Sequence, residues 1–312
     1  MKGLEISRRF FLEWGLPFLQ QHFPRLATRV AAGKIGGSDC LGADDAISRD
    51  HDWGPLFMLW LDQDDHRDYA SAVRQKIDEA APDSFLGYSR PDNSYVAEIH
   101  SRIEYFDHHV GIHVPPESGS EWMPDAYAEE MLYDITHGSI YYDPTGRLNS
   151  LRQGFAAFAR DPIFRLRRLV DTCFGVWHYG EYNFCERLVH REDAVSLHVC
   201  LAKFIENVIR QSFYLNNDYC PYWKWLHHEF LKIPGQQEVG SLLDDLVSSD
   251  SLEQQADIVG RICGIQREMI RAAGIVEDPG SPGLFGLYTA IQQKVEALRA
   301  EIPKWYIGPG ER

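Results

Sequence analysis

The pattern of apolar and polar positions divides the chain into two parts with different periodicity. Residues 4–24 carry apolar side chains at every fourth position, which predicts a helix with one buried face, bent or ended at Pro17 and Pro24. The runs that read as strands are residues 29–35, 52–61, 95–106, 109–114 and 139–142. Because the run 52–61 is strongly apolar, it predicts a strand that is covered on both faces.

Helical spacing dominates the chain beyond Pro144. The segments with this spacing are residues 162–190, a stretch that starts at Ala194, and residues 221–231, 237–248, 251–273 and 284–300. The two patterns together predict an α+β fold, in which a small mixed sheet is followed by an all-helical domain. The predicted domains are residues 1–145, with the N-terminal helix and the sheet, and residues 146–312.

Composition and charge limit the partners of such a protein. With 312 residues and 44% apolar side chains, the chain can bury a substantial core. Its formal net charge of −15 disfavours binding to a polyanion, so we expect no nucleic-acid partner. The six cysteines lack close pairs, which predicts reduced, buried thiols. No uncharged apolar stretch of about 18 residues occurs, so we expect no membrane association and a cytoplasmic location.

Two short motifs near the start carry the candidate chemistry. Gly37 and Ser38 form a turn sequence that lets the backbone come close to a phosphate, with amide donors and one hydroxyl available. Asp50 and Asp52 would share one face of an extended segment, about 7 Å apart. Paired carboxylates suit Mg²⁺, which is usually held by one or two protein carboxylates and by substrate phosphates. The two motifs together predict a metal-nucleotide site.

The spacing of these motifs resembles a known signature. Gly37-Ser38, followed after eleven residues by Asp50-His51-Asp52, resembles the nucleotidyltransferases with a DNA polymerase beta-like palm, a superfamily that includes the aminoglycoside (kanamycin-type) enzymes. Residues 36–55 resemble more closely a bacterial branch known as domain of unknown function 4037. Further similar stretches are Ser101-Arg102-Ile103-Glu104-Tyr105, Tyr141-Tyr142-Asp143-Pro144 and Tyr219-Cys220-Pro221-Tyr222-Trp223-Lys224-Trp225-Leu226.

The resemblance implies a fold and a reaction. The fold would be a nucleotidyltransferase palm, and the reaction would move a nucleoside monophosphate from ATP or another NTP to a hydroxyl of a small-molecule acceptor, with release of pyrophosphate. Two Mg²⁺ ions held by Asp50, Asp52 and a third acid would serve as cofactors. Glu104 is the expected third acid, because it lies between apolar neighbours in the run 95–106. Glu98 and Asp107 are its competitors, and strand alternation does not separate Glu98 from Glu104.

Other candidate side chains have competing interpretations. By resemblance, Gly37 and Ser38 would bind phosphate and Lys224 would neutralise the leaving pyrophosphate, although a lysine can equally extend over apolar surface. The aromatic neighbours of Lys224 are expected in the core. Asp39, Asp44 and Asp45 read as loop and cap residues, while Arg49 could pair with Asp50 or reach a phosphate. The pair His109-x-x-x-His113 lies in a run that alternates like a strand, so we do not expect a zinc site there.

Two other classes of function remain open on the sequence. One is a protein-modifying enzyme that attaches AMP to a Ser, Thr or Tyr of a partner protein. The other is a non-catalytic nucleotide-binding scaffold that has kept the palm fold. The presence of both aspartates and of a possible third acid favours an active enzyme.

Overall fold

The structure is a computed structural model that describes residues 1–49, 51–90, 95–191, 193–277, 279–280 and 283–299. The chain forms two compact units. The first, here called the sheet unit, comprises residues 1–115 and 124–156. The second, here called the helical unit, comprises residues 116–123 and 157–312. The predicted α+β class with a small mixed sheet is confirmed.

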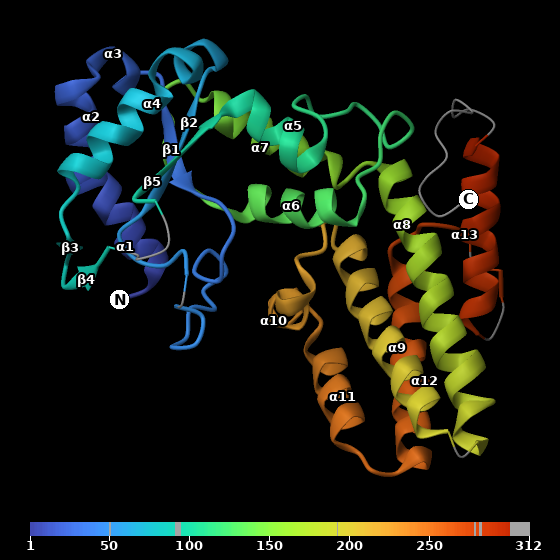
Figure 1. Ribbon diagram of the computed structural model, residues 1–312. Coiled ribbons are helices and arrows are strands. Elements are labelled where there is room, and N and C mark those ends of the chain that lie inside the picture. Colours follow the sequence, from blue (N-terminus) through green and yellow to red (C-terminus); the bar gives the residue numbers. More distant parts are fainter. Residues whose placement is uncertain (50, 91–94, 192, 278, 281–282, 300–312) are drawn as a thin grey trace. The chain divides into compact units, whose positions relative to one another are not determined.

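The sheet unit contains the strands and the N-terminal helices (Figure 1). Its elements are α1 (Gly3–Phe10), the π-helical η1 (Phe11–Gly15), α2 (Leu16–His22), α3 (Pro24–Ala27), β1 (Ala31–Lys34), β2 (Phe57–Leu61), α4 (Gln63–Ala80), β3 (Ser84–Phe85), β4 (Tyr88–Ser89), β5 (Ala97–Ser101), α5 (Arg102–Val110), α6 (Ala126–His137), β6 (Ser139–Tyr142) and α7 (Arg147–Phe158). The predicted boundary after residue 145 falls just before α7, which starts in this unit.

Four strands form a mixed sheet in the order β5-β2-β1-β6. β1 pairs antiparallel with β2 and β6, while β2 and β5 run parallel. The C-terminal end of β1 and the N-terminal ends of β2 and β5 therefore meet at one edge of the sheet. The register Gly33–Met58–Glu98 forms one row across three strands close to that edge.

The two faces of the sheet differ in chemistry. One face packs on the N-terminal helices and on α4, in a core that includes Phe10, Phe11, Leu19, Val73, Ile77, Phe57, Leu59, Leu61, Ala97 and Ile99. Because side chains alternate along a strand, the other face carries Met58 and Trp60 from β2 and Glu98 and His100 from β5. We call this second face the polar face.

Some predicted strands are shorter than expected or absent among the described residues. The run 52–61 becomes a strand only from Phe57, because Asp52 and Gly54 have φ angles of 49° and 116° and turn the chain. The run 95–106 is a strand only to Ser101 and continues as α5. The strand predicted for residues 109–114 was wrong, since α5 extends to Val110 and ends at Gly111 with φ 84°.

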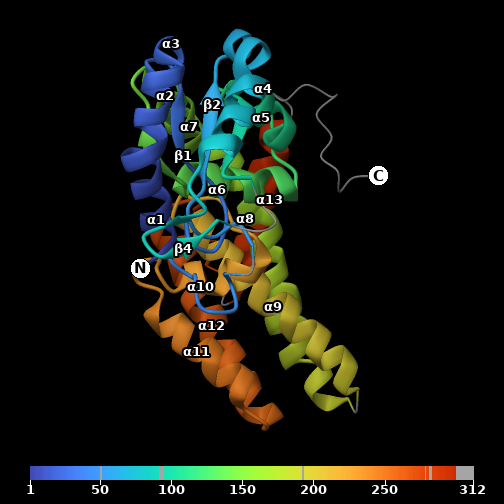
Figure 2. The ribbon, with the colours of Figure 1, turned by 60° about the vertical axis from the view of Figure 1, so that its left-hand side comes forward.

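The regular secondary structure of the helical unit, in its described residues, is helical. Its elements are α8 (Pro162–Gly175), the π-helical η2 (Val176–Cys185), η3 (Leu188–His190), α9 (Ala194–Leu215), η4 (Trp223–Trp225), α10 (Leu226–Phe230), α11 (Gln237–Ser248), α12 (Leu252–Ala272) and α13 (Leu284–Arg299). In both ribbon views α8, α9 and α12 run side by side (Figure 2). In the part of the chain that the structure describes, no helix combines the length and the apolar composition needed to cross a bilayer.

Candidate active site

The glycine turn that follows β1 lies at the sheet edge where β2 and β5 begin. Gly36 and Gly37 have φ angles of 77° and 87°, a region in which side chains are strained. A Cβ on Gly36 would lie 3.3 Å from Oδ2 of Asp134, which belongs to α6, and a Cβ on Gly37 would lie 3.0 Å from Oδ1 of Asp39. The two glycines thus allow two carboxylates to lie directly against the turn.

A buried ion pair underlies this turn. Lys34, the last residue of β1, and Asp39 are each 3% exposed, and Lys34 Nζ lies 2.5 Å from Asp39 Oδ2. Burial raises the pKa of Asp39, and the ammonium group of Lys34 offsets this only in part. Lys34 Nζ also donates a hydrogen bond to the backbone carbonyl oxygen of Asp52. The pair therefore connects β1 with the segment that carries the Asp-His-Asp motif.

The acidic motif does not form the extended segment that the sequence predicted. Asp52 has an exposed side chain and a φ of 49°, which is the left-handed region and not a strand conformation. The alternation argument for a shared face therefore fails at Asp52. Asp50 lies outside the described residues, and its role as a metal ligand stays a prediction.

Asp44 fixes the loop between the glycine turn and Asp52. Its buried carboxylate accepts hydrogen bonds from Lys2 Nζ at 2.7 Å, Gly3 N at 2.8 Å and Trp53 Nε1 at 3.1 Å. Burial alone would raise the pKa of Asp44, but these donors outweigh it and lower the pKa to about 2. The sequence assigned Asp44 to a loop and gave no sign that it connects the N-terminus of α1 to Trp53.

Arg49 and Ser38 also have partners within this loop. The guanidinium carbon of Arg49 lies 4.6 Å from the centroid of the Trp53 ring, and its Nε donates to Asp44 O at 3.3 Å. Ser38 Oγ donates to Ser48 O at 3.2 Å. In this arrangement the Ser38 hydroxyl connects the two ends of the loop between Ser38 and Ser48. The contact of Ser38 with a phosphate stays a prediction.

Glu98 lies at the same sheet edge as the glycine turn. It is the second residue of β5, pairs in register with Met58 and points to the polar face. Met58 Sδ in turn accepts a hydrogen bond from Ile35 N at 3.3 Å, which places Met58 between Glu98 and the glycine turn. Glu98 is half-buried, and its Oε2 lies 3.4 Å from His100 Nε2.

The predicted strand position of Glu104 was wrong. Glu104 lies in the first turn of α5, where its backbone N–H donates to Ser101 Oγ at 3.4 Å, an N-cap interaction. Its side chain is 60% exposed, and Oε2 lies 3.9 Å from His66 Nδ1 of α4. Because α5 follows the C-terminal end of β5, Glu104 lies at the opposite sheet edge from Gly37.

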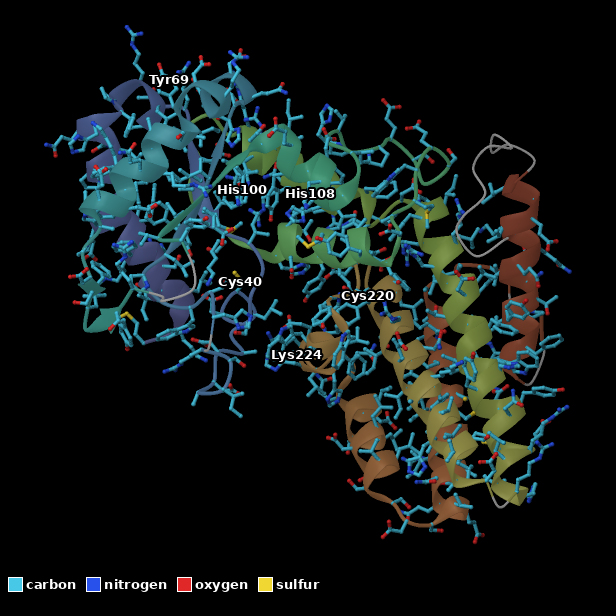
Figure 3. All side chains as sticks on the ribbon, viewed as in Figure 1. Cys40, Tyr69, His100, His108, Cys220 and Lys224 are labelled. Atoms are coloured by element: carbon cyan, nitrogen blue, oxygen red, sulfur yellow. The ribbon has the colours of Figure 1, made fainter. Side chains whose placement is uncertain are left out.

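The remaining competitor and the histidine pair have local partners. Asp107 Oδ1 lies 2.8 Å from His113 Nδ1. His109 Nδ1 lies 2.9 Å from the hydroxyl of Tyr127, and burial lowers the pKa of His109. His109 and His113 therefore have different partners. A third histidine, His100, lies on β5 (Figure 3).

The residues at the sheet edge have the right chemistry for a hard cation. Carboxylate oxygens are the ligands that Mg²⁺ prefers. Asp52 and Glu98 supply such oxygens, and Asp134 adds a third near Gly36. Among the described side chains, which exclude Asp50, no group of three His, Cys, Asp or Glu is arranged to hold a metal ion. Burial raises the pKa of Cys40, which lies in the same loop.

Lys224 belongs to the helical unit, in the 3₁₀ turn η4 (Figure 3). Its side chain is exposed, with Nζ 5.0 Å from the centroid of the Trp225 ring. The expectation that its aromatic neighbours lie in the core was wrong for two of them, since Tyr222 is 43% and Trp223 66% exposed. The role of Lys224 toward a triphosphate stays a prediction.

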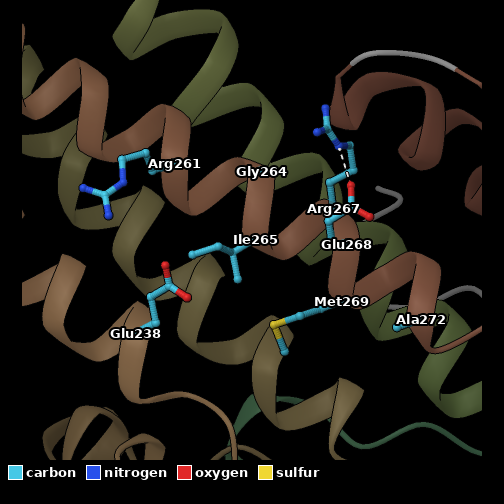
Figure 4. A pocket seen from close by; sticks show the side chains of 8 residues that line it. All are labelled: Glu238, Arg261, Gly264, Ile265, Arg267, Glu268, Met269 and Ala272. Atoms are coloured by element: carbon cyan, nitrogen blue, oxygen red, sulfur yellow. Dashed lines mark hydrogen bonds and ion pairs between the residues drawn. The ribbon is translucent and has the colours of Figure 1, made fainter.

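The helical unit also has a surface pocket of about 610 Å³ between α11 and α12 (Figure 4). Its lining residues are Glu238, Arg261, Gly264, Ile265, Arg267, Glu268, Met269 and Ala272. Arg267 Nε lies 3.3 Å from Glu268 Oε1, so neighbouring opposite charges on the rim compensate each other. None of the predicted site residues lines this pocket.

Comparison with known proteins supports part of the predicted resemblance. Residues 125–226 match the family described as domain of unknown function DUF4037. This segment includes Tyr141–Pro144 and Tyr219–Leu226 but not residues 36–55, and it covers less than half of the chain. No curated protein matches. A solved structure of a nucleotidyltransferase-like protein from Exiguobacterium sibiricum 255-15 is similar with a TM-score of 0.38 and 10% identity, over 92% of this chain and 91% of that chain.

Proposed function

We propose that this protein is a nucleotidyltransferase that transfers a nucleoside monophosphate, AMP from ATP, to a hydroxyl of a small-molecule acceptor and releases pyrophosphate. The observation that supports the proposal is the position of three features at one sheet edge. These are the glycine turn after β1, Asp52 before β2 and Glu98 at the start of β5. A phosphate-binding turn beside carboxylates on neighbouring strands is what a metal-dependent phosphoryl-group reaction requires.

In this proposal Glu98 replaces Glu104 as the third acid. Asp50, Asp52 and Glu98 would hold two Mg²⁺ ions, which would neutralise the charge on the attacking and leaving oxygens. Glu98 is suited to this task because it is half-buried at the same edge as Gly37, whereas Glu104 lies in the first turn of α5 at the other edge. Gly37, which has no side chain, would let a phosphate approach the backbone N–H groups of the turn.

The test is pyrophosphate release from each NTP in the presence of Mg²⁺ and a metabolite extract. The matched variant is Asp52→Asn, because asparagine tolerates the left-handed backbone of Asp52 and keeps the size of the side chain. We expect release by the wild type and a loss of at least about a hundredfold in the variant. Folded wild-type protein that releases no pyrophosphate, or an Asp52→Asn variant as active as the wild type, would contradict the proposal.

The acceptor class is tested in the same reaction with ATP labelled at the α-phosphate. Label in a small molecule supports the proposal, while label on a polypeptide would assign the protein to the AMP-transferases that modify partner proteins. If the protein is a scaffold without activity, the wild type and the Asp52→Asn variant should bind Mg-ATP equally well.

Lys224 forms a separate part of the proposal. Its exposed ammonium group would neutralise the β- and γ-phosphates of the nucleotide. Lys224→Gln is then expected to raise KM for ATP more than it lowers kcat. Equal KM values for Lys224→Gln and the wild type would leave Lys224 as an ordinary surface lysine.

A further inference from the structure

We infer that Lys34 is a positioning residue for the proposed metal site, because it holds the backbone of Asp52 against the end of β1. The inference rests on the proposed function and adds a residue to it. Lys34 would touch neither the metal nor the substrate. It would act through Asp52, by fixing the place from which that carboxylate projects.

The burial of Lys34 requires an explanation. Lys34 is 3% exposed in a strand whose other residues are Ala31, Ala32 and Gly33. A buried ammonium group is costly unless it is paired and hydrogen-bonded. Asp39 supplies the opposite charge at 2.5 Å, and the carbonyl oxygen of Asp52 supplies a second acceptor. Lys34 therefore connects the end of β1 with Asp39 and with the backbone of Asp52, two positions in the irregular loop that follows.

The segment around Asp52 needs such a support. Pairing of β2 begins only at Phe57 with β5 and at Met58 with β1. Asp52 and Gly54 both lie in turn conformations. On one side, Trp53 Nε1 donates to the buried Asp44 at 3.1 Å. On the other side, Lys34 donates to the carbonyl of Asp52. The two contacts hold consecutive residues, so together they fix the backbone position from which the Asp52 side chain projects.

The same pair also touches the proposed phosphate turn. A Cβ on Gly37 would lie 3.0 Å from Asp39 Oδ1 and 3.9 Å from Lys34 Cε. The Lys34–Asp39 pair is thus in contact with the glycine turn and with the acidic loop at once. One buried interaction therefore sets the distance between the two parts of the proposed site.

The experiment compares the wild type with the double variant Lys34→Met/Asp39→Leu. Removing both charges avoids an uncompensated buried charge, so the fold should be retained, which circular dichroism and thermal unfolding test. Mn²⁺ binding, followed by the electron paramagnetic resonance signal of the free ion, should weaken at least about tenfold, as on loss of a residue that orients a metal ligand. Amide hydrogen exchange at residues 51–53 should accelerate without metal, while exchange in α4 should stay unchanged.

Two lysine substitutions serve as controls. Lys34→Arg keeps the charge and the donors, and should retain most of the Mn²⁺ affinity. Lys76→Met removes an exposed lysine of α4 and should match the wild type in both measurements. If the double variant unfolds, Lys34→Gln/Asp39→Asn takes its place, because it also removes both charges, and the glutamine side chain is one atom shorter than lysine and does not reach the Asp52 carbonyl. It should show the same faster exchange at residues 51–53.

The outcomes separate this inference from the proposed function. Wild-type Mn²⁺ affinity and slow exchange in the folded double variant, or in Lys34→Gln/Asp39→Asn, would overturn the positioning role and leave the proposed function intact. Mn²⁺ binding that is equal in the wild type and in Asp52→Asn would overturn the proposed metal site and, with it, the role of Lys34.

Discussion

Asp39 and Asp44 are buried in the same loop, yet their pKa values shift in opposite directions. Burial dominates at Asp39 and raises its pKa, although Lys34 lies at 2.5 Å. At Asp44 the donors Lys2, Gly3 and Trp53 dominate and lower the pKa to about 2. Asp39 also has a second donor, since it accepts the N–H of Cys40 at 3.0 Å. The difference therefore lies in the cost of burial, which outweighs the donors at Asp39 but not at Asp44.

Asp44→Asn should destabilise the protein in a pH-dependent way. The pKa of Asp44 falls from 3.8 to about 2 on folding, so its charged form stabilises the fold above pH 4, and this contribution is lost as pH falls toward 2. We expect the variant to lose about 2 kcal/mol of unfolding free energy at neutral pH and to approach the wild type near pH 2. Urea unfolding across this range measures the difference. The exposed Asp250→Asn serves as control, and a difference that grows on acidification would contradict the prediction.

Glu98→Gln and Glu104→Gln should separate the two candidate third acids. Both substitutions remove one negative charge and keep the size of the side chain. Glu98→Gln should lower pyrophosphate release by about a hundredfold or more, because Glu98 shares a sheet edge with Gly37. Glu104→Gln should leave the rate close to that of the wild type and reduce helix stability slightly. The opposite ranking in steady-state kinetics would restore Glu104 as the third acid.

At the scale of elements, periodicity predicted the helices and most strands. Helix capping at Ser101 explains why the chain after β5 is a helix and not a longer strand. The strand prediction for residues 95–106 runs past Ser101, yet Ser101 and Glu104 have the spacing of a capping box, which starts a helix. That signal was present in the sequence and locates the end of β5. Lys34 gave a weaker signal, since a lysine within a buried strand requires a carboxylate partner, but nothing in the sequence identified Asp39 as that partner.

The caps make a prediction for α8. Asp161 Oδ1 accepts hydrogen bonds from Ile163 N at 2.9 Å and Phe164 N at 2.8 Å, and also from Gly119 N at 2.9 Å. Asp161→Ala removes the cap and leaves these N–H groups without their acceptor, so we expect a loss of about 2 kcal/mol. Urea unfolding measures it. Asp257→Ala, an exposed substitution within α12, is the matched control, and equal stabilities of the two variants would contradict the prediction.

At the scale of the whole molecule, the change of periodicity along the chain predicted the fold class, while the sequence could not give the conformation of the acidic loop. The apolar content and the change of periodicity near residue 145 were sufficient for an α+β chain with a helical second half. The loop from Asp39 to Trp53 depends on contacts with Lys2 and Lys34, which are distant in sequence from Asp44 and Asp52. Such long-range contacts leave no periodic pattern.

The net charge of −15 makes a prediction for binding of the intact protein. Because neutralisation of phosphates by lysine and arginine drives non-specific binding to nucleic acids, we expect no binding of single-stranded RNA or DNA tighter than about 100 μM at physiological salt. Fluorescence anisotropy with a labelled oligonucleotide measures this. Salt-sensitive binding in the low micromolar range would show that local basic residues outweigh the total charge.

The path of the chain has a consequence for any attempt to study the two units separately. The chain leaves the sheet unit after Pro115, returns at Pro124 and leaves again after Ala156. Residues 116–123 contribute to the helical unit, where the Trp122 ring lies 5.8 Å from that of Phe158. One proteolytic cut therefore releases neither half intact, and a gene fragment that starts at residue 157 would encode α8 without the amide of Gly119 that its cap holds. To isolate the helical unit, a gene would have to encode residues 116–123 fused to the segment that starts at residue 157.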